Sequence, residues 1–127
     1  MGLVGYGNIA RRVEQIVAAM GARVLHTSTR DDGTPDWRPF SELLAASDIV
    51  SLHLPLTPET STLIDQTALA SMKPEALLIN TSRGGIVDEA ALIDALRTGR
   101  LSAAGLDVFA AEPVDSANPL LGLENVV

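Results

Sequence analysis

Near its start the chain carries two glycines and an alanine with the spacing of a phosphate-binding turn, Gly5-x-Gly7-x-x-Ala10. Gly5 permits a tight turn, and Gly7 lets the backbone approach a pyrophosphate, whose charge then lies at the amino end of a helix. The alternative is a glycine turn that serves packing alone, but an apolar run before it and a helical pattern after it favour nucleotide binding. The residues of this turn that we expect to contact the nucleotide are Gly5, Tyr6, Gly7, Asn8 and Ile9.

A second group of polar residues bears on which nucleotide is bound. In domains with this turn, an acidic residue about 20 positions further on takes the ribose hydroxyls. Here that place holds Ser28, followed by Thr29 and Arg30. A hydroxyl and a guanidinium suit a 2′-phosphate, whereas a carboxylate would repel it, so the sequence favours NADP, with NAD as the alternative. Asp31 and Asp32 argue for NAD, because a slightly longer strand would bring one of them to the ribose, and Arg30 would then be a solvated loop charge.

These residues must be positioned by alternating strands and helices. Short, nearly continuous apolar runs are typical of strands that are covered on both faces of a parallel sheet. The runs are Met1–Val4, Arg23–Thr27, Asp48–Leu54, Ala76–Asn80 and Ala103–Phe109, with Asn125-Val126-Val127 resembling the beginning of one more. Strand alternating with helix predicts an α/β fold of the Rossmann type, a doubly wound parallel sheet. Both ends of the chain fall inside expected strands, so we expect this sheet to be truncated at both ends.

Helical patterns lie between the apolar runs. The apolar residues of the first helix share one face, which we expect to be buried, and they are Ile9, Val13, Ile16, Val17 and Met20, with Gly21 placed to end the helix. Shorter patterns cover Ser41–Ala46 and Gln66–Met72. In the clearest helix, Asp88–Arg97, Asp88 is expected to cap the amino end and Gly99 to follow the carboxyl end. The core-facing residues of that helix are Leu92, Ile93 and Leu96.

Composition limits the classes of partner. The 127 residues and 13.3 kDa fit one globular domain, with 46% hydrophobic and 20% charged residues. A net charge of −7 and a pI near 4.6 argue against nucleic acid or an anionic membrane surface as a partner. The absence of cysteine excludes disulfides, thiolate nucleophiles and cysteine-ligated metals, and we predict no metal site. Without a signal pattern or an apolar run of membrane length, the expected location is cytoplasmic.

Three longer motifs carry a family resemblance. They are "SDIVSLHLPLTPETSTLID", "LLINTSRGGIVDEAALIDAL" and "AAGLDVFAAEP". With them the chain, from Gly2 to Val127, resembles the cofactor domain of the D-isomer-specific 2-hydroxyacid dehydrogenases. The resemblance implies that Arg83, in the N-x-S-R-G motif, holds the carboxylate and carbonyl of a 2-oxo acid, a role that suits a bidentate guanidinium. It also implies that Glu112 pairs with a catalytic histidine and keeps that histidine protonated as an acid.

The resemblance extends to further cofactor contacts. Asp107 matches an aspartate near the nicotinamide carboxamide, and Thr81 and Ser82 lie along the same strand end as Arg83. The residues that match the adenine side are His53, Leu54, Pro55 and Thr57. We interpret His53 as structural or cofactor-adjacent rather than catalytic, and His26 as a residue of the core or the sheet face.

The family's catalytic histidine follows the "N-V-V" strand in a P-H motif, which residues 1–127 do not include. The family also has a second, substrate-binding domain, so we expect residues 1–127 to be the NAD(P)-binding domain alone and to be inactive alone. The implied enzyme reduces a small 2-oxo acid, with glyoxylate or hydroxypyruvate as candidates and a phosphoglycerate dehydrogenase as the runner-up. The alternative class is a dinucleotide-binding or regulatory module without turnover. Unpaired strand edges would favour self-association.

Overall fold

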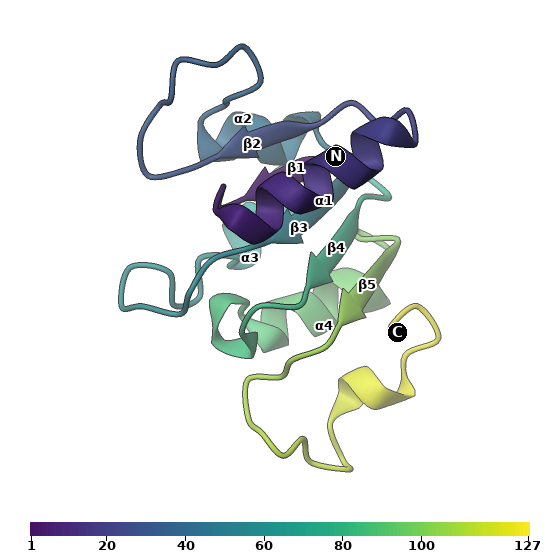
Figure 1. Ribbon diagram of the computed structural model, residues 1–127. Helices are drawn as coiled ribbons and strands as arrows, with labels where there is room; N and C mark the ends of the chain where they lie inside the picture. Colours follow the sequence, from purple (N-terminus) through teal and green to yellow (C-terminus); the bar gives the residue numbers. More distant parts are fainter.

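The computed structural model describes residues 1–127 and is built on one five-stranded parallel sheet. The strands are β1 (Gly2–Val4), β2 (Leu25–Thr27), β3 (Ile49–Leu52), β4 (Leu77–Asn80) and β5 (Ala103–Leu106). Their order across the sheet is β2-β1-β3-β4-β5 (Figure 1). The α/β fold and all five expected strands are thus confirmed. The strands are shorter than the apolar runs. β1 pairs with β2 and with β3 over three residues, and the other two ladders extend over four.

Helices follow the strands in alternation, as expected. They are α1 (Asn8–Ala19), α2 (Phe40–Ala46), α3 (Gln66–Ser71) and α4 (Glu89–Arg97), with 3-10 turns η1 (Gly84–Ile86) and η2 (Pro119–Gly122). Asp65, which the sequence analysis did not single out, caps α3 by accepting a hydrogen bond from Ala68 N at 2.8 Å. No helix is long and apolar enough to cross a membrane.

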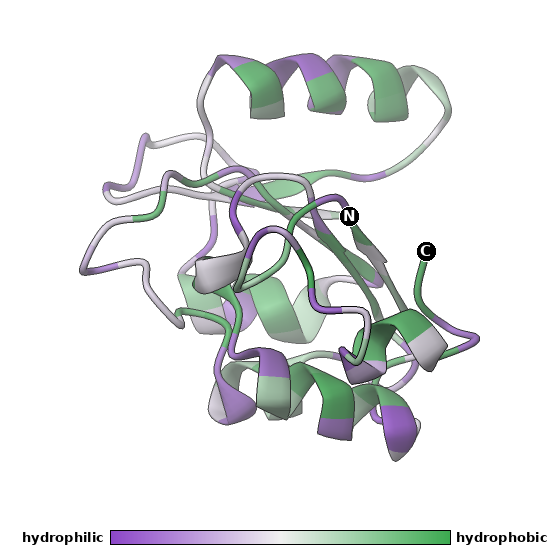
Figure 2. Cartoon of the chain, turned by 90° about the horizontal axis from the view of Figure 1, so that it is seen from below, coloured by the Kyte–Doolittle hydropathy of each residue, from purple (hydrophilic) through white to green (hydrophobic).

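The helices form two unequal layers. Helix α1 lies alone on one face of the sheet, while α2, α3 and α4 cover the other (Figures 1 and 2). On the second face the helices and strands enclose a core of 20 buried residues, whereas the core beneath α1 consists of Leu3, Ala10 and Val24. This division follows from the strand order. The chain moves from β1 to β2 in one direction, then returns past β1 to β3 and continues in the other direction. Because crossover connections between parallel strands are right-handed, the helices change face when the direction changes.

Helix α1 corrects one expectation. Ile9, Ile16 and Met20, expected to be buried, are 72%, 51% and 80% exposed. The helix rests on the sheet through Ala10, with Val13 and Val17 partly buried beside it. Its apolar arc is wider than one sheet surface can cover, and the flank with Ile9, Ile16 and Met20 turns away from the strands. The expected helix end is confirmed, because the helix stops at Ala19 just before Gly21.

The two edges of the sheet also differ from expectation. β1 lies between β2 and β3, so its shortness leaves no open edge. At the β2 edge, His26 forms a parallel bridge with Trp37, and at the β5 edge Ala104 does so with Val126. The second bridge confirms that Asn125-Val126-Val127 begins to extend the sheet. The expectation of wholly unpaired edges is wrong, and self-association stays a prediction without that physical basis.

The amino end of α4 provides a test of the fold. Asp88 accepts a hydrogen bond from Ala91 N at 3.1 Å, and this cap orients a helix whose Leu92 and Leu96 are buried. We predict that Asp88→Ala lowers the free energy of unfolding by about 1 kcal/mol, because the first-turn amide loses its partner. Urea denaturation measures this loss, and Asp94→Ala, at an exposed position of the same helix, is the control. Equal losses in the two variants would contradict the capping role.

Candidate cofactor-binding site

The glycine turn between β1 and α1 is forced against the end of β3. Gly5 has φ +90° and donates its backbone N–H to Thr27 O at 3.0 Å. A Cβ at Gly5 would lie 2.6 Å from the carbonyl oxygen of His53. Only glycine therefore fits at this position, both for its backbone angle and for the approach of the two turns.

Gly7 leaves the amino end of α1 open. It is the N-cap residue of the helix, in an extended conformation, and no side chain caps the first-turn amides. The first turn contains no acidic residue. A Cβ at Gly7 would meet no atom within 4 Å, so the space beside these amides is free of protein. Free amides and the positive end of the helix dipole suit the pyrophosphate of a dinucleotide.

This turn borders a cleft of about 860 Å³ at the carboxyl edge of the sheet. The lining residues come from the turns after β1, β3 and β4, and they are Gly7, Asn8, Ile9, Ala10, His53, Leu54, Pro55, Leu56, Thr81, Ser82 and Arg83. The strand order reverses between β1 and β3, and ligands of open parallel sheets bind at that reversal. The cleft brings together nine of the expected residues, with Gly5 and Tyr6 in the same turn as Gly7.

Backbone-directed hydrogen bonds hold the turn that carries Arg83. Buried Asn80 donates through Nδ2 to Arg83 O at 2.9 Å and accepts from Ser82 N at 3.1 Å. Ser82 Oγ donates to Leu52 O at 2.7 Å, which fixes the turn to the end of β3. The exposed Arg83 side chain donates from Nη1 to Ser82 O and has no carboxylate within 4.0 Å. Arg83 is therefore not a structural ion-pair residue, and its guanidinium lies at the cleft without a carboxylate partner.

The loop after β5 packs on Gly84, which follows Arg83 in the turn after β4. A Cβ at Gly84 would lie 2.0 Å from the backbone of Phe109, so the loop reaches this position only because residue 84 is glycine. Glu89, at the start of α4, accepts hydrogen bonds from Ala110 N at 3.1 Å and from Asn118 Nδ2 at 2.8 Å. Within this loop the exposed Glu112 accepts a hydrogen bond from Phe109 N at 3.2 Å. The segment with Glu112 therefore lies beside the turn with Arg83.

Other expected residues lie outside the cleft lining. Asp107 follows β5 and donates its backbone N–H to Asn80 O at 3.0 Å, and Thr57 follows the cleft-lining residues after β3. Ser28, Thr29 and Arg30 follow β2 at the same edge of the sheet, where Ser28 Oγ donates to Arg30 O at 2.7 Å. No carboxylate lies within 4.0 Å of Arg30.

The two aspartates after Arg30 have local partners. Asp31 accepts a hydrogen bond from Gly33 N at 2.8 Å. Asp32 accepts from both the backbone and the hydroxyl of Thr34 and lies 2.9 Å from His26 Nε2. Both carboxylates are thus bonded within the loop, and β2 does not extend to them as the alternative for NAD required.

The two histidines have different surroundings. His53 lines the cleft, and burial lowers its pKa below the ordinary value, so it is uncharged at neutral pH. Its Nε2 lies 3.0 Å from Ser51 Oγ. His26 is buried in β2, which confirms its interpretation as a core residue.

Sequence reasoning missed Leu56 and Glu89. Leu56 lines the cleft directly after Pro55, and no spacing or polar chemistry distinguishes it. Glu89 follows the helix cap Asp88, and an acid there is expected from the helix dipole alone. Its bonds to residues 110 and 118 depend on where the loop after β5 folds, which no local pattern predicts.

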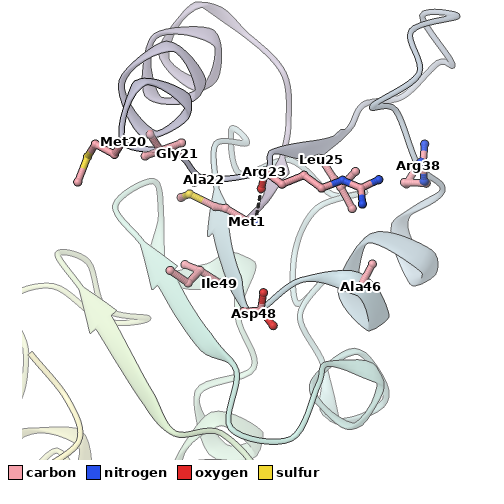
Figure 3. Close-up of a pocket in the computed structure, with 11 residues that line it drawn as sticks. Met1, Met20, Gly21, Ala22, Arg23, Leu25, Arg38, Ala46, Asp48 and Ile49 are labelled. Atoms are coloured by element: carbon pink, nitrogen blue, oxygen red, sulfur yellow. Dashed lines mark hydrogen bonds between the residues drawn. The ribbon is translucent and has the colours of Figure 1, made fainter.

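A second hollow, of about 640 Å³, lies at the opposite edge of the sheet between the end of α1 and the starts of β2 and β3 (Figure 3). Its charged side chains include Arg38, which donates to Pro35 O and Trp37 O, and Asp48, which forms an ion pair with Lys73 at 2.8 Å. These groups are already bonded, and the amino edge of a parallel sheet is not where such folds bind ligands. The cleft at the carboxyl edge is therefore the candidate site.

The fold and this cleft define a dinucleotide-binding domain of the Rossmann class. The protein-family model that describes the NAD-binding domain of D-isomer-specific 2-hydroxyacid dehydrogenases matches residues 1–127 of this sequence. The chain belongs to that family of nicotinamide-dependent oxidoreductases, and residues 1–127 correspond to its NAD-binding domain.

Individual relatives agree with this assignment. The chain is 44% identical to a glyoxylate reductase of Aeropyrum pernix and 45% identical to a D-3-phosphoglycerate dehydrogenase of Mycobacterium leprae, in each case over 100% of its length. It spans 40% of the first relative and 25% of the second. The TT0316 protein of Thermus thermophilus superposes with a TM-score of 0.94 at 45% identity, covering 99% of this chain and 40% of that one.

Solved relatives differ in the cofactor they contain. A D-lactate dehydrogenase of Lactobacillus jensenii, with TM-score 0.90 and 39% identity, was solved with NAD+, and the match covers 99% of this chain and 43% of that one. A D-isomer-specific 2-hydroxyacid dehydrogenase of Xanthobacter autotrophicus Py2, with TM-score 0.94 and 37% identity, was solved with NADPH, and the match covers 100% and 42%. A nicotinamide dinucleotide is therefore the cofactor of this family, in either form.

The glycine turn has an electrostatic property that can be measured directly. Tyr6, the one tyrosine of the chain, donates its hydroxyl proton to Glu14, and this bond, with burial, raises the pKa of Tyr6 from 10.0 to about 12. Because the folded-state value is raised, the stabilisation is complete below about pH 10 and is lost as the pH rises toward 12. We predict this delayed ionisation in an ultraviolet titration of the phenolate.

Glu14→Gln is expected to move the midpoint of that titration back toward 10, since the charged acceptor is lost. Glu42→Gln, which makes the same charge change at an exposed position of α2, is the control. Circular dichroism at each pH shows whether the chain is still folded. A midpoint at the ordinary value in the folded wild-type chain would contradict the Tyr6–Glu14 bond.

Proposed function

We propose that this chain binds NADPH at the carboxyl edge of its sheet and serves as the cofactor domain of a reductase for small 2-oxo acids. The observation that supports this most is that the uncapped amino end of α1 and the guanidinium of Arg83, free of any ion pair, open into one cleft. When bound, the nicotinamide supplies the hydride that reduces the carbonyl of the substrate.

Each part of the edge has a proposed role toward the cofactor. The amides after Gly5 and Gly7 hold the pyrophosphate, and Thr29 and Arg30, with Ser28, face the 2′-phosphate. Ser28 already donates its proton to Arg30 O, which leaves the guanidinium as the main donor. The residues proposed for the adenine side are His53, Leu54, Pro55 and Thr57, and those for the nicotinamide side are Thr81, Ser82 and Asp107.

Arg83 and Glu112 are the proposed catalytic residues of this chain. Arg83 holds the carboxylate of the 2-oxo acid and polarises the adjacent carbonyl, which suits a planar guanidinium with no competing partner. Glu112 raises the pKa of an acid–base histidine, so that a proton is available for the developing alkoxide. We propose that this histidine and the substrate-binding domain come from outside residues 1–127, in keeping with relatives that are more than twice as long.

Glyoxylate or hydroxypyruvate is the proposed substrate, with a phosphoglycerate-type substrate second. Relatives of both kinds are nearly equally similar to the chain, at 44% and 45% identity, so identity does not separate them. A binding or regulatory module without turnover is the alternative function. The free guanidinium of Arg83 favours the reductase, since a module that only binds a dinucleotide has no use for a carboxylate-binding arginine. Cytoplasmic location and self-association stay predictions.

We predict that the chain binds NADPH more tightly than NADH, and that Arg30→Ala weakens NADPH binding about tenfold, because a charge-assisted hydrogen bond to a phosphate is lost. NADH binding is expected to change little. Parallel fluorescence titrations with the two nucleotides measure both effects. Arg97→Ala, which removes the same charge at the exposed end of α4, is the control. Tighter binding of NADH by the wild-type chain would contradict the proposed cofactor.

We also predict that residues 1–127 alone do not measurably reduce glyoxylate with NADPH. The chain has two histidines: His26 is buried, and the pKa of His53 is lowered by burial, so at neutral pH few of its side chains carry a proton to donate. Oxidation of NADPH, followed by its absorbance, measures the rate, with the glyoxylate reductase of Aeropyrum pernix as the positive control. Robust turnover would show that a group within these residues serves as the acid.

A further inference from the structure

His26 joins the glycine turn to the loop after β2. Its ring stacks on that of Tyr6, with centroids 3.6 Å apart and planes 8° from parallel, and Tyr6 stands between the two glycines of the turn. The residue is 1% exposed. His26 does not line the cleft, so any effect of this buried residue on the site acts through the groups that it holds in place.

The other side of the same residue holds the loop. Its Nε2 lies 2.9 Å from Asp32 Oδ2 and 3.4 Å from Thr34 Oγ1. Because a carboxylate only accepts, Nε2 carries the proton of this hydrogen bond. The backbone of His26 also donates to Asp36 O at 3.0 Å and accepts from Arg38 N at 2.9 Å. One residue of β2 thus contacts four residues of the loop, Asp32, Thr34, Asp36 and Arg38.

These bonds turn the carboxylate of Asp32 into the loop. Its Oδ1 accepts from Thr34 N at 3.0 Å and from Thr34 Oγ1 at 2.7 Å, while Oδ2 faces His26. The hydrogen bonds from Thr34, with that from His26, lower the pKa of Asp32 to about 2, so the group is ionised at neutral pH. An ionised carboxylate two residues from Arg30 would compete for that guanidinium and repel a phosphate if it were released.

We propose that His26 is a positioning residue for cofactor selectivity: by holding Asp32 within the loop, it keeps a negative charge away from the 2′-phosphate site at Ser28–Arg30. The inference rests on the proposed dinucleotide binding. It deepens that function, because selectivity then depends on a residue that touches no cofactor. A released Asp32 would disfavour the 2′-phosphate and accept hydrogen bonds from ribose hydroxyls, which favours NADH.

The test is the ratio of the Kd for NADH to the Kd for NADPH, measured by fluorescence titration of residues 1–127. His26→Phe keeps an aromatic ring against Tyr6 but cannot donate to Asp32. We expect the ratio to fall about fivefold, which is the effect of one charge roughly 4 Å from another in water. Asp32→Ala breaks the same hydrogen bond but removes the charge, so its ratio is expected to equal or exceed that of the wild type.

The double variant His26→Phe/Asp32→Ala separates positioning from general damage. We expect it to regain the wild-type ratio, because no carboxylate is left to be released. Fluorescence of Trp37, the one tryptophan, which bridges to His26, is expected to shift in both single variants, since both free the loop. Should His26→Phe not fold, Thr34→Val, at an exposed position, loosens the same carboxylate and is expected to lower the ratio by a smaller factor.

The outcomes distinguish this inference from the proposed function. If the wild-type chain binds neither nucleotide, the proposed function is overturned, and the inference with it. If the wild type binds nucleotide and the folded His26→Phe and Thr34→Val variants keep its ratio, only the inference is overturned. A lowered ratio that the double variant does not restore also overturns it, because the loss then does not come from Asp32.

Discussion

β1 pairs with both β2 and β3, and this double pairing sets the arrangement of the helices and of the cleft. Because β1 lies between β2 and β3, the chain leaves it toward one side and then returns to pass it on the other. That reversal places α1 on one face and the other helices opposite, and it opens the carboxyl edge between β1 and β3. This arrangement requires glycine at position 5, because the turn after β1 lies in contact with the His53 carbonyl.

The carboxyl edge is ordered by side chains that bond the backbone rather than each other. Asn80 and Ser82 fix the turn after β4, and Glu89 ties the loop after β5 to α4. These bonds use polar groups that surround Arg83 and leave its guanidinium without a carboxylate partner. The Arg83 guanidinium donates to the carbonyl of the preceding residue rather than to a carboxylate, so no ion pair must break before an anion binds, which is a form of preorganisation.

Local sequence patterns predicted the helices and strands correctly. They did not predict burial where it depends on the elements packed opposite. Asp88 was correctly expected to cap its helix, and Gly21 to follow the end of α1, because both effects act within a few residues. The buried face of α1 was misjudged for Ile9 and Met20, since periodicity shows that apolar residues share a side but not how wide a surface lies opposite. The hydrogen-bond partners of Asp32 could not be predicted from the sequence either, because they depend on how the loop folds onto β2.

The class of fold and the family could be predicted from the amino-acid sequence, which also suggested residues for the site. Strand and helix periods act locally, and the motifs around Gly7, Arg83 and Glu112 occur in their family order. Three relations became visible in the folded chain: the turns after β1, β3 and β4 line one cleft, Arg83 has no ion pair, and His26 bonds Asp32. The physical reason is that these relations join residues far apart in the chain, and parallel register alone brings them to one edge.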